Sequence, residues 1–163
     1  MSTPPQRPRR NHRPRVDGAV RQCRLTDGGT PFANDRHRIL RAVIDALRRH
    51  PVVTDARGQP PSTFTEVTAT LAPRRWGHDA TDATLRVTWQ PLDPPEFAFH
   101  YSEDGFDCGW HREPNPHVDG DDHYQERVGA DDYRYEPVSF EGETAPELTW
   151  EIMERLRQRL DRR

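Results

Sequence analysis

One cysteine and three histidines, able to bind a metal or transfer protons, lie within the stretch CGWHREPNPHVDGDDHYQER, residues 108–127. Cys108, His111, His117 and His123 have the spacing C-x2-H-x5-H-x5-H. Cysteine and histidine are zinc ligands, and histidine also exchanges protons near neutral pH. The segment therefore offers two chemistries, metal binding and acid–base catalysis.

A predicted hairpin sets the direction of the first of these side chains. Asp104-Gly105 is a type I′ turn pair between two runs of alternating apolar residues. The register that it sets pairs Glu103 with Phe106, Tyr101 with Cys108 and Phe99 with Trp110. The large apolar side chains then share one face. The other, solvent-facing side receives His100, Asp107, Gly109 and His111.

This register argues against a metal centre. It points Cys108 into the core and His111 away from it, so the four ligands do not converge as zinc requires. We therefore expect no metal and no cofactor. The same register makes Cys108 a poor nucleophile, since nothing nearby lowers the pKa of its thiol.

Acid–base cleavage of a phosphodiester needs a base, an acid and a cation to hold the phosphate. His111, His117 and His123 suit the two proton-transfer roles. Three further residues complete the predicted site: Arg112 and Arg127 would hold phosphate, and Tyr124 would stack a base. The alternative is that the three histidines are surface residues of a polar loop.

The elements that would carry this loop form an α+β domain. A helix from Asn34 or Asp35 to about His50 has one apolar stripe and one arginine-rich face. From Val52 the period changes to two, which predicts an antiparallel sheet of about five or six strands. A capping box at Thr144 and Glu147 starts a C-terminal amphipathic helix.

Charge is unevenly distributed along the 163 residues. All 24 basic residues are arginine, and the net charge is −3. Residues 1–50 carry 12 Arg and 4 Asp, whereas residues 51–150 carry 7 Arg and 20 acidic residues. Acidic, lysine-free composition is typical of a salt-loving organism, in which an acidic surface keeps proteins soluble.

Residues 1–33 form a predicted disordered arm, followed by a single domain over residues 34–163. The arm is rich in proline and arginine and has little to bury. Four of its arginines are candidate contacts to nucleic-acid phosphates: Arg9, Arg10, Arg13 and Arg15. The alternative is a solvated tail without a fixed role.

The location of the protein is predicted from absent signals. The N-terminal residues lack the apolar core of a secretory signal, and no apolar run is long enough to span a membrane. Two cysteines, Cys23 and Cys108, make no disulfide framework. We expect a cytoplasmic protein that does not bind membranes.

Three stretches of the C-terminal two-fifths carry a family resemblance: FHYSEDGFDCGWHREPNPHVDGDDHYQE, YRYEPVSF and ELTWEIMERL. A strand pair, a polar loop, a tyrosine-rich strand and a closing helix in this order resemble the TumE-type toxins of toxin–antitoxin systems. In that family the loop tends to read Gly-Asp-His, with a second histidine two places on. Here Gly120, Asp122 and His123 match, and Gln125 stands in place of the second histidine.

The resemblance implies a small α+β cytoplasmic toxin that acts on RNA or translation and is neutralised by a cognate antitoxin. With Gln125 in the family's histidine position, His117 or His111 would serve as the second catalytic histidine. Two other functions stay open. One is a non-enzymatic module that binds nucleic acid or protein through the arginine-rich arm and helix face, and the other is a structural or regulatory partner.

Overall fold

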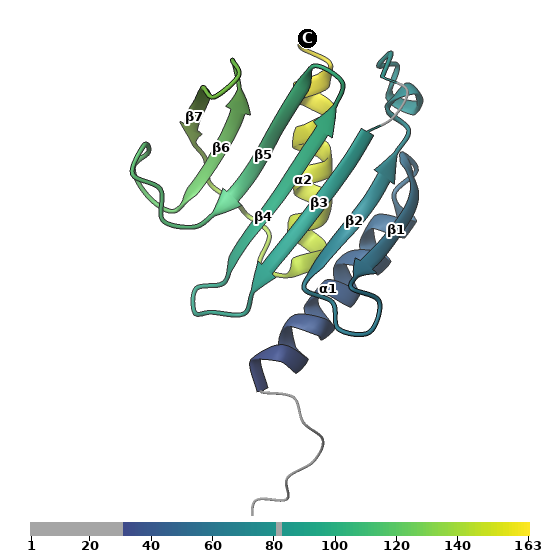
Figure 1. The fold of residues 1–163 in the computed structure, drawn as a ribbon, viewed down its shortest axis with the longest axis vertical. Helices are drawn as coiled ribbons and strands as arrows, with labels where there is room; N and C mark the ends of the chain where they lie inside the picture. The colour runs from purple at the N-terminus through teal and green to yellow at the C-terminus, as the bar shows by residue number, and fades with distance from the viewer. Residues whose placement is uncertain (1–30, 81–82) are drawn as a thin grey trace, which may run out of the picture.

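The computed structural model describes residues 31–80 and 83–163 (Figure 1). Nearly all of the predicted arm, with its four candidate arginines and Cys23, lies outside the described residues. Residues 31–33, which were assigned to the arm, are helical. Helix α1 begins at Pro31 and not at Asn34 or Asp35. A proline is compatible with the first helical turn, where its missing N–H would have no partner.

The described residues form an α+β domain with a seven-stranded antiparallel sheet. The strands lie in chain order, as β1 (Val53–Gln59), β2 (Glu66–Leu71), β3 (Ala83–Gln90), β4 (Glu96–Glu103), β5 (Phe106–Arg112), β6 (Asp122–Arg127) and β7 (Tyr133–Pro137). The helices are α1 (Pro31–Arg49), α2 (Ala145–Leu160) and the 3-10 helix η1 (Pro73–Trp76). The α+β prediction is confirmed, with one or two more strands than expected.

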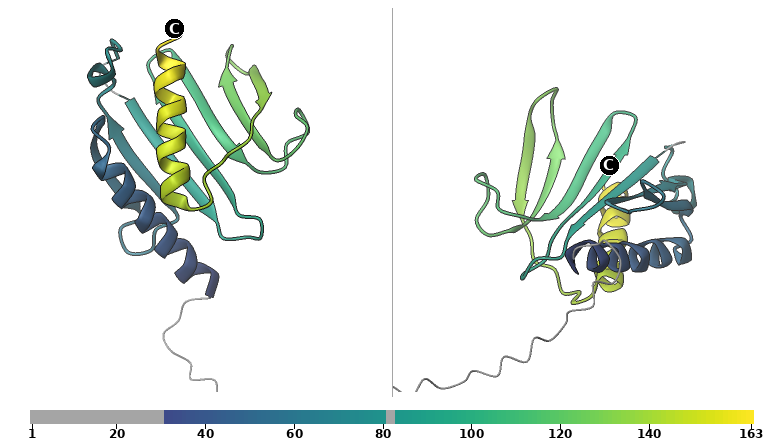
Figure 2. Two further views of the ribbon diagram at one scale, coloured as in Figure 1. Left: turned by 180° about the vertical axis from the view of Figure 1, so that it is seen from behind. Right: turned by 60° about the horizontal axis from the view of Figure 1, so that its bottom comes forward.

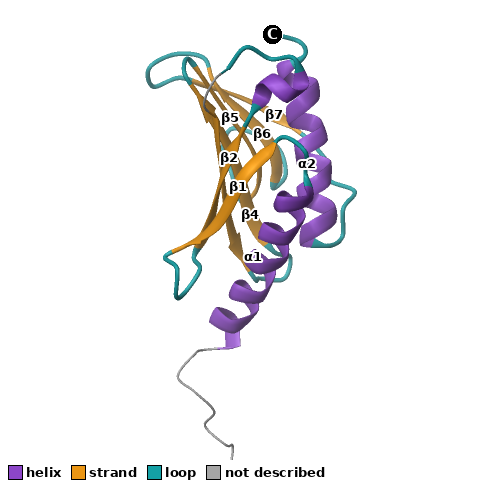
Figure 3. Ribbon diagram, turned by 90° about the vertical axis from the view of Figure 1, so that its right-hand side faces the viewer, coloured by secondary structure: helices purple, strands orange, loops and turns teal. Residues whose placement is uncertain are grey.

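Both long helices lie against the same face of the sheet (Figure 2, left; Figure 3). Alternation of side chains makes this packing possible, since every second residue of a strand points to the same face. In β3 and β4 the alternate residues are buried against the helices. The opposite face of the sheet carries no helix among the described residues, and we call it the open face.

The predicted hairpin between β4 and β5 is confirmed in every pair. Glu103 lies opposite Phe106, Tyr101 opposite Cys108 and Phe99 opposite Trp110. Gly105 adopts φ 73°, as a type I′ turn requires. The apolar members of these pairs are buried on the helix-covered face.

Strand β6 corrects the expectation of a continuous polar loop after Arg112. Residues 122–127 pair with β5 on one side and with β7 on the other. Their polar composition hid the strand, because Tyr124 is its only apolar residue. Neither long helix among the described residues is long and apolar enough to span a lipid bilayer.

Helix α2 begins with the predicted capping box. The Thr144 hydroxyl accepts a hydrogen bond from the Glu147 N–H at 3.4 Å, and the Glu147 carboxylate accepts one from the Thr144 N–H at 2.9 Å. We expect Thr144→Ala to lower the free energy of unfolding by about 1 kcal/mol, measured by urea denaturation. Thr63→Ala, at an exposed position between β1 and β2, is the matched control. Equal values for the two variants would contradict the prediction.

Candidate functional site: a buried histidine pair on the open face

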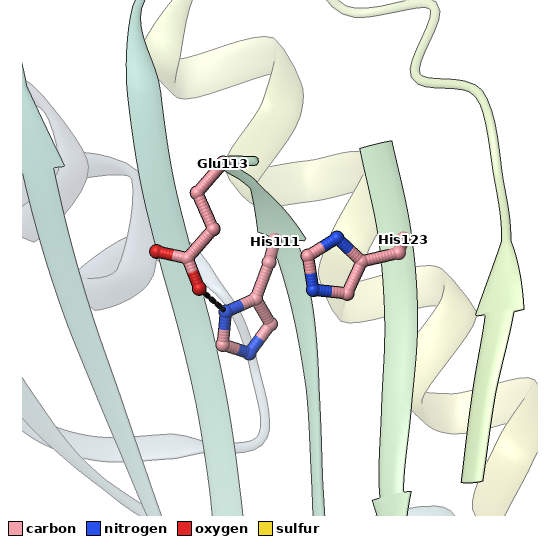
Figure 4. Close-up of side chains that lie close together, drawn as sticks. All are labelled: His111, Glu113 and His123. Atoms are coloured by element: carbon pink, nitrogen blue, oxygen red, sulfur yellow. Dashed lines mark hydrogen bonds and ion pairs between the residues drawn. The ribbon is translucent and has the colours of Figure 1, made fainter. Parts of the chain in front are cut away.

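Two of the predicted catalytic histidines lie side by side on the open face. His111 of β5 is paired directly with His123 of β6. Their neighbours Trp110 and Tyr124 point into the core, so both imidazoles point to the other side. The two rings stack with centroids 5.1 Å apart and planes inclined by 19° (Figure 4).

Both histidines are buried although no helix in the described part of the chain covers them. His111 is 7% exposed and His123 is 0% exposed. The loop between β5 and β6 contacts the pair through Asn115, and Tyr135 of β7 lies beside His123 with ring centroids 6.2 Å apart. His111 therefore lies on the predicted face of the sheet, opposite the apolar core. The expectation that it is exposed to solvent is wrong.

Hydrogen bonds define the protonation of His123. Its Nδ1 lies 3.0 Å from the carbonyl oxygen of Asp121, which can only accept, so Nδ1 carries the proton. Nε2 then presents a lone pair to the amide nitrogen of Asn115, which lies 3.0 Å away. The Asn115 oxygen in turn accepts from the His117 N–H at 2.9 Å, which fixes the direction of the amide. This network fits a neutral imidazole.

His111 is held by one partner only. Its Nδ1 lies 3.0 Å from the Glu113 carboxylate, and its Nε2 is buried with no hydrogen-bond partner among the described residues. Burial lowers the pKa of His111, and the nearby His123 and His100 lower it further, while Glu113 raises it. His111 is therefore a neutral base at neutral pH, with one buried nitrogen free.

Gly109 provides the space for the His111 ring. A Cβ atom at Gly109 would lie 2.6 Å from His111 Nε2 and 3.0 Å from the Phe99 carbonyl oxygen. Residues 109 and 111 share the open face of β5, and the ring of His111 lies over the glycine. Beyond it, His100 Nε2 lies 2.9 Å from Asp107 Oδ1, so the polar cluster extends across three strands.

Two predicted substrate contacts lie on the wrong face. Arg112 donates two hydrogen bonds to Asp122, at 2.6 and 3.0 Å, on the helix-covered side of the sheet. Tyr124 is 3% exposed in the core and its hydroxyl donates to Glu126. Neither side chain reaches a substrate bound at the histidines, because strand alternation places it behind the sheet.

The other two predicted residues lie on the open face but apart from the pair. His117 is exposed in the loop and stacks on Tyr135 with centroids 5.1 Å apart. Arg127 is exposed at the far end of β6, and its guanidinium donates to the Tyr133 hydroxyl. The structure thus brings together His111 and His123, with His117 at the edge of the site.

Cys108 takes no part in this cluster. It lies fully buried on the helix-covered face, where burial raises the pKa of its thiol to about 12. Cys108 and His111 lie on opposite faces of the sheet, as the hairpin register predicted. Cys108 therefore cannot share a metal ion with the histidines.

Glu113 and Asn115 were not selected by the sequence analysis. Glu113 stands two residues after His111, the spacing that places side chains on the same face of a strand, so that signal was present. Asn115 depends on the path of the loop, which no local pattern specifies.

Comparisons with protein-family models, curated proteins and solved structures find no match for this chain. The site is therefore interpreted from its own geometry.

The fit of His111 over Gly109 gives a prediction. We expect Gly109→Ala to displace the His111 ring and to lower the free energy of unfolding by about 1–3 kcal/mol, since the new methyl group overlaps both ring and backbone. Gly129→Ala, whose Cβ would meet only Asp132 at 3.4 Å, is the control and should change stability by less than about 0.5 kcal/mol. Histidine NMR resonances that stay in place in Gly109→Ala would refute the packing argument.

The lowered pKa of His111 predicts a pH dependence of stability. As pH falls below 6.5, the ordinary value for histidine, the unfolded chain takes up a proton that folded His111 refuses. Stability is therefore lost with falling pH, by up to about 1.4 kcal/mol per pH unit for this residue. The measurement is urea unfolding of wild type and His111→Asn between about pH 7.5 and pH 5.

The comparison with His111→Asn isolates this residue. Burial also lowers the pKa of His50, which contributes equally in both proteins. A pH slope that is the same in wild type and His111→Asn would contradict the prediction.

Proposed function

We propose that the protein is a toxin-like, metal-independent ribonuclease with His111 and His123 as its acid–base pair. The observation that carries the proposal is the free, buried Nε2 of His111, on a ring oriented by Glu113 and stacked against a second imidazole. A histidine whose other nitrogen is held by a carboxylate is a common form of general base. The resemblance to TumE-type toxins supports RNA as the substrate class.

In this mechanism His111 Nε2 takes the proton of a ribose 2′-OH. The 2′ oxygen attacks phosphorus, and the bond from phosphorus to the 5′ oxygen breaks. His123 takes up a proton from solvent at Nε2 once Asn115 withdraws and gives it to the leaving oxygen, while its Nδ1–H stays bound to the Asp121 carbonyl. The products are a 2′,3′-cyclic phosphate and a 5′-hydroxyl end.

Substrate access requires the loop between β5 and β6 to move. Asn115 occupies His123 Nε2, and His117 covers Tyr135. When the loop withdraws, a nucleobase can replace His117 on the Tyr135 ring, which gives Tyr135 the stacking role first assigned to Tyr124. Arg127 lies on the same face at the far end of β6, so it is the candidate contact to a neighbouring phosphate and not to the one that is cleaved.

A second protein fits this scheme. His111 and His123 lie on the open face, which has no covering helix among the described residues (Figure 3). A cognate antitoxin that binds this face would prevent the loop from moving. This assignment of the partner follows the family resemblance and belongs to the proposal.

The test is cleavage of a fluorescent RNA in the presence of EDTA. We expect His111→Ala and His123→Ala to lower the rate by about 10²- to 10⁴-fold, because each removes one proton-transfer group. His37→Ala is the control, since His37 lies on α1 and stacks on Phe64. The same oligonucleotide with a 2′-deoxy linkage should not be cleaved.

Two results would overturn the proposal. One is intact RNA after incubation with folded wild-type protein over a panel of structured and single-stranded substrates. The other is cleavage that persists unchanged in both histidine variants, which would identify a contaminating nuclease or a different site.

A further inference from the structure

A metal-ligand set different from the one rejected above is present at the histidine pair. His111, Glu113 and His123 each place one ligand atom within 4.8 Å of the other two (Figure 4). Two of these side chains are at least nine-tenths buried, and His111 Nε2 has no partner among the described residues. We infer that His111, Glu113 and His123 bind a first-row divalent transition-metal ion of the Zn²⁺ class.

The donor types favour such an ion. Two imidazoles and one carboxylate are a frequent three-residue set for zinc, with one coordination position left for water or substrate. Mg²⁺ and Ca²⁺ prefer sites made of oxygen atoms and should bind poorly here. Glu113 replaces Cys108, so the set no longer requires a ligand from the helix-covered face.

Binding an ion requires these side chains to move closer together. Ligands about 2.1 Å from a tetrahedral zinc ion lie roughly 3.4 Å from one another. The widest separation here, 4.8 Å, therefore has to shorten by roughly 1.4 Å. The Glu113 side chain is 48% exposed and free to rotate, and its carboxylate already lies 3.0 Å from His111 Nδ1. The imidazole rings have to turn as well, because a metal ion lies in the plane of each ring that binds it and the two planes are inclined by only 19°.

His123 is already oriented as a ligand. Histidines that bind metals usually donate their second N–H to a carbonyl or carboxylate, which fixes the tautomer and the ring. Here the Asp121 carbonyl holds Nδ1–H, and the lone pair on Nε2 is directed at the Asn115 amide. The amide thus competes with a metal ion for the same nitrogen.

This site also predicts a regulatory effect. An imidazole that binds a metal ion cannot also take up a proton, so a bound ion prevents acid–base catalysis by His111 and His123. Inhibition of RNA cleavage by Zn²⁺ rests on the proposed function. Metal binding itself does not, and it is measured without RNA.

The experiment titrates the full chain, freed of metal by a chelator, with Zn²⁺ by calorimetry and with Co²⁺ by visible absorption. We expect one ion per chain and a Co²⁺ spectrum typical of nitrogen and oxygen ligands. His123→Gln should weaken binding by about 10- to 100-fold, and His37→Ala should leave it unchanged. Millimolar Mg²⁺ should not compete.

Asn115→Ala provides a test that leaves all three ligands in place. Without the competing amide, we expect Zn²⁺ affinity to increase by about 2- to 10-fold, which corresponds to one hydrogen bond. Unchanged or weaker affinity in Asn115→Ala would overturn the inference. So would absence of Zn²⁺ binding by the wild type, or binding that His123→Gln does not alter.

Discussion

The turn at Asp104-Gly105 determines which side chains of three strands share a face. Gly105 closes the turn in the left-handed region, and Phe99 then lies opposite Trp110. Since side chains alternate along a strand, a shift of one residue would exchange core and open faces over the whole hairpin. Burial of each large aromatic side chain contributes about 1.5–3 kcal/mol, which holds this register. The position of His111 beside His123 follows from apolar packing on the other side of the sheet.

The open face therefore carries a second buried cluster, which is polar. The apolar core fixes its position but contributes no side chains to it. Asp121 and Asn115 satisfy the two ring nitrogens of His123, whereas His111 Nε2 stays without a partner among the described residues. A buried polar atom without a hydrogen bond costs about 1–3 kcal/mol. Such a cost is a small fraction of what the aromatic core contributes, and unpaired buried atoms often mark sites that bind a ligand.

Local patterns predicted the parts of the fold that local interactions determine. The hairpin, the apolar stripe of α1 and the capping box at Thr144 all appear where expected, because each depends on residues a few positions apart. Strand β6 was missed, since its polar residues line both faces and the loop that joins it to β5 has no tight-turn pattern to indicate the pairing. Without this strand, Arg112 and Tyr124 were assigned to a loop. In the structure they belong to strands, and alternation places both side chains on the helix-covered face. The partners in the loop, Asn115 above all, depend on its three-dimensional path.

The lone pair on His123 Nε2 links the two chemistries that the sequence first suggested. A carbonyl oxygen fixes the proton on Nδ1, so Nε2 is available to an amide, a proton or a metal ion. A neutral hydrogen bond from Asn115 contributes about 0.5–1.5 kcal/mol, less than the bond of imidazole to a zinc ion or a proton. A proton or a metal ion that binds His123 Nε2 therefore displaces the Asn115 amide and releases this contact of the loop. Acid–base catalysis and metal binding are in this sense competing uses of one preorganised nitrogen, and the weak contact of Asn115 keeps that nitrogen accessible to both.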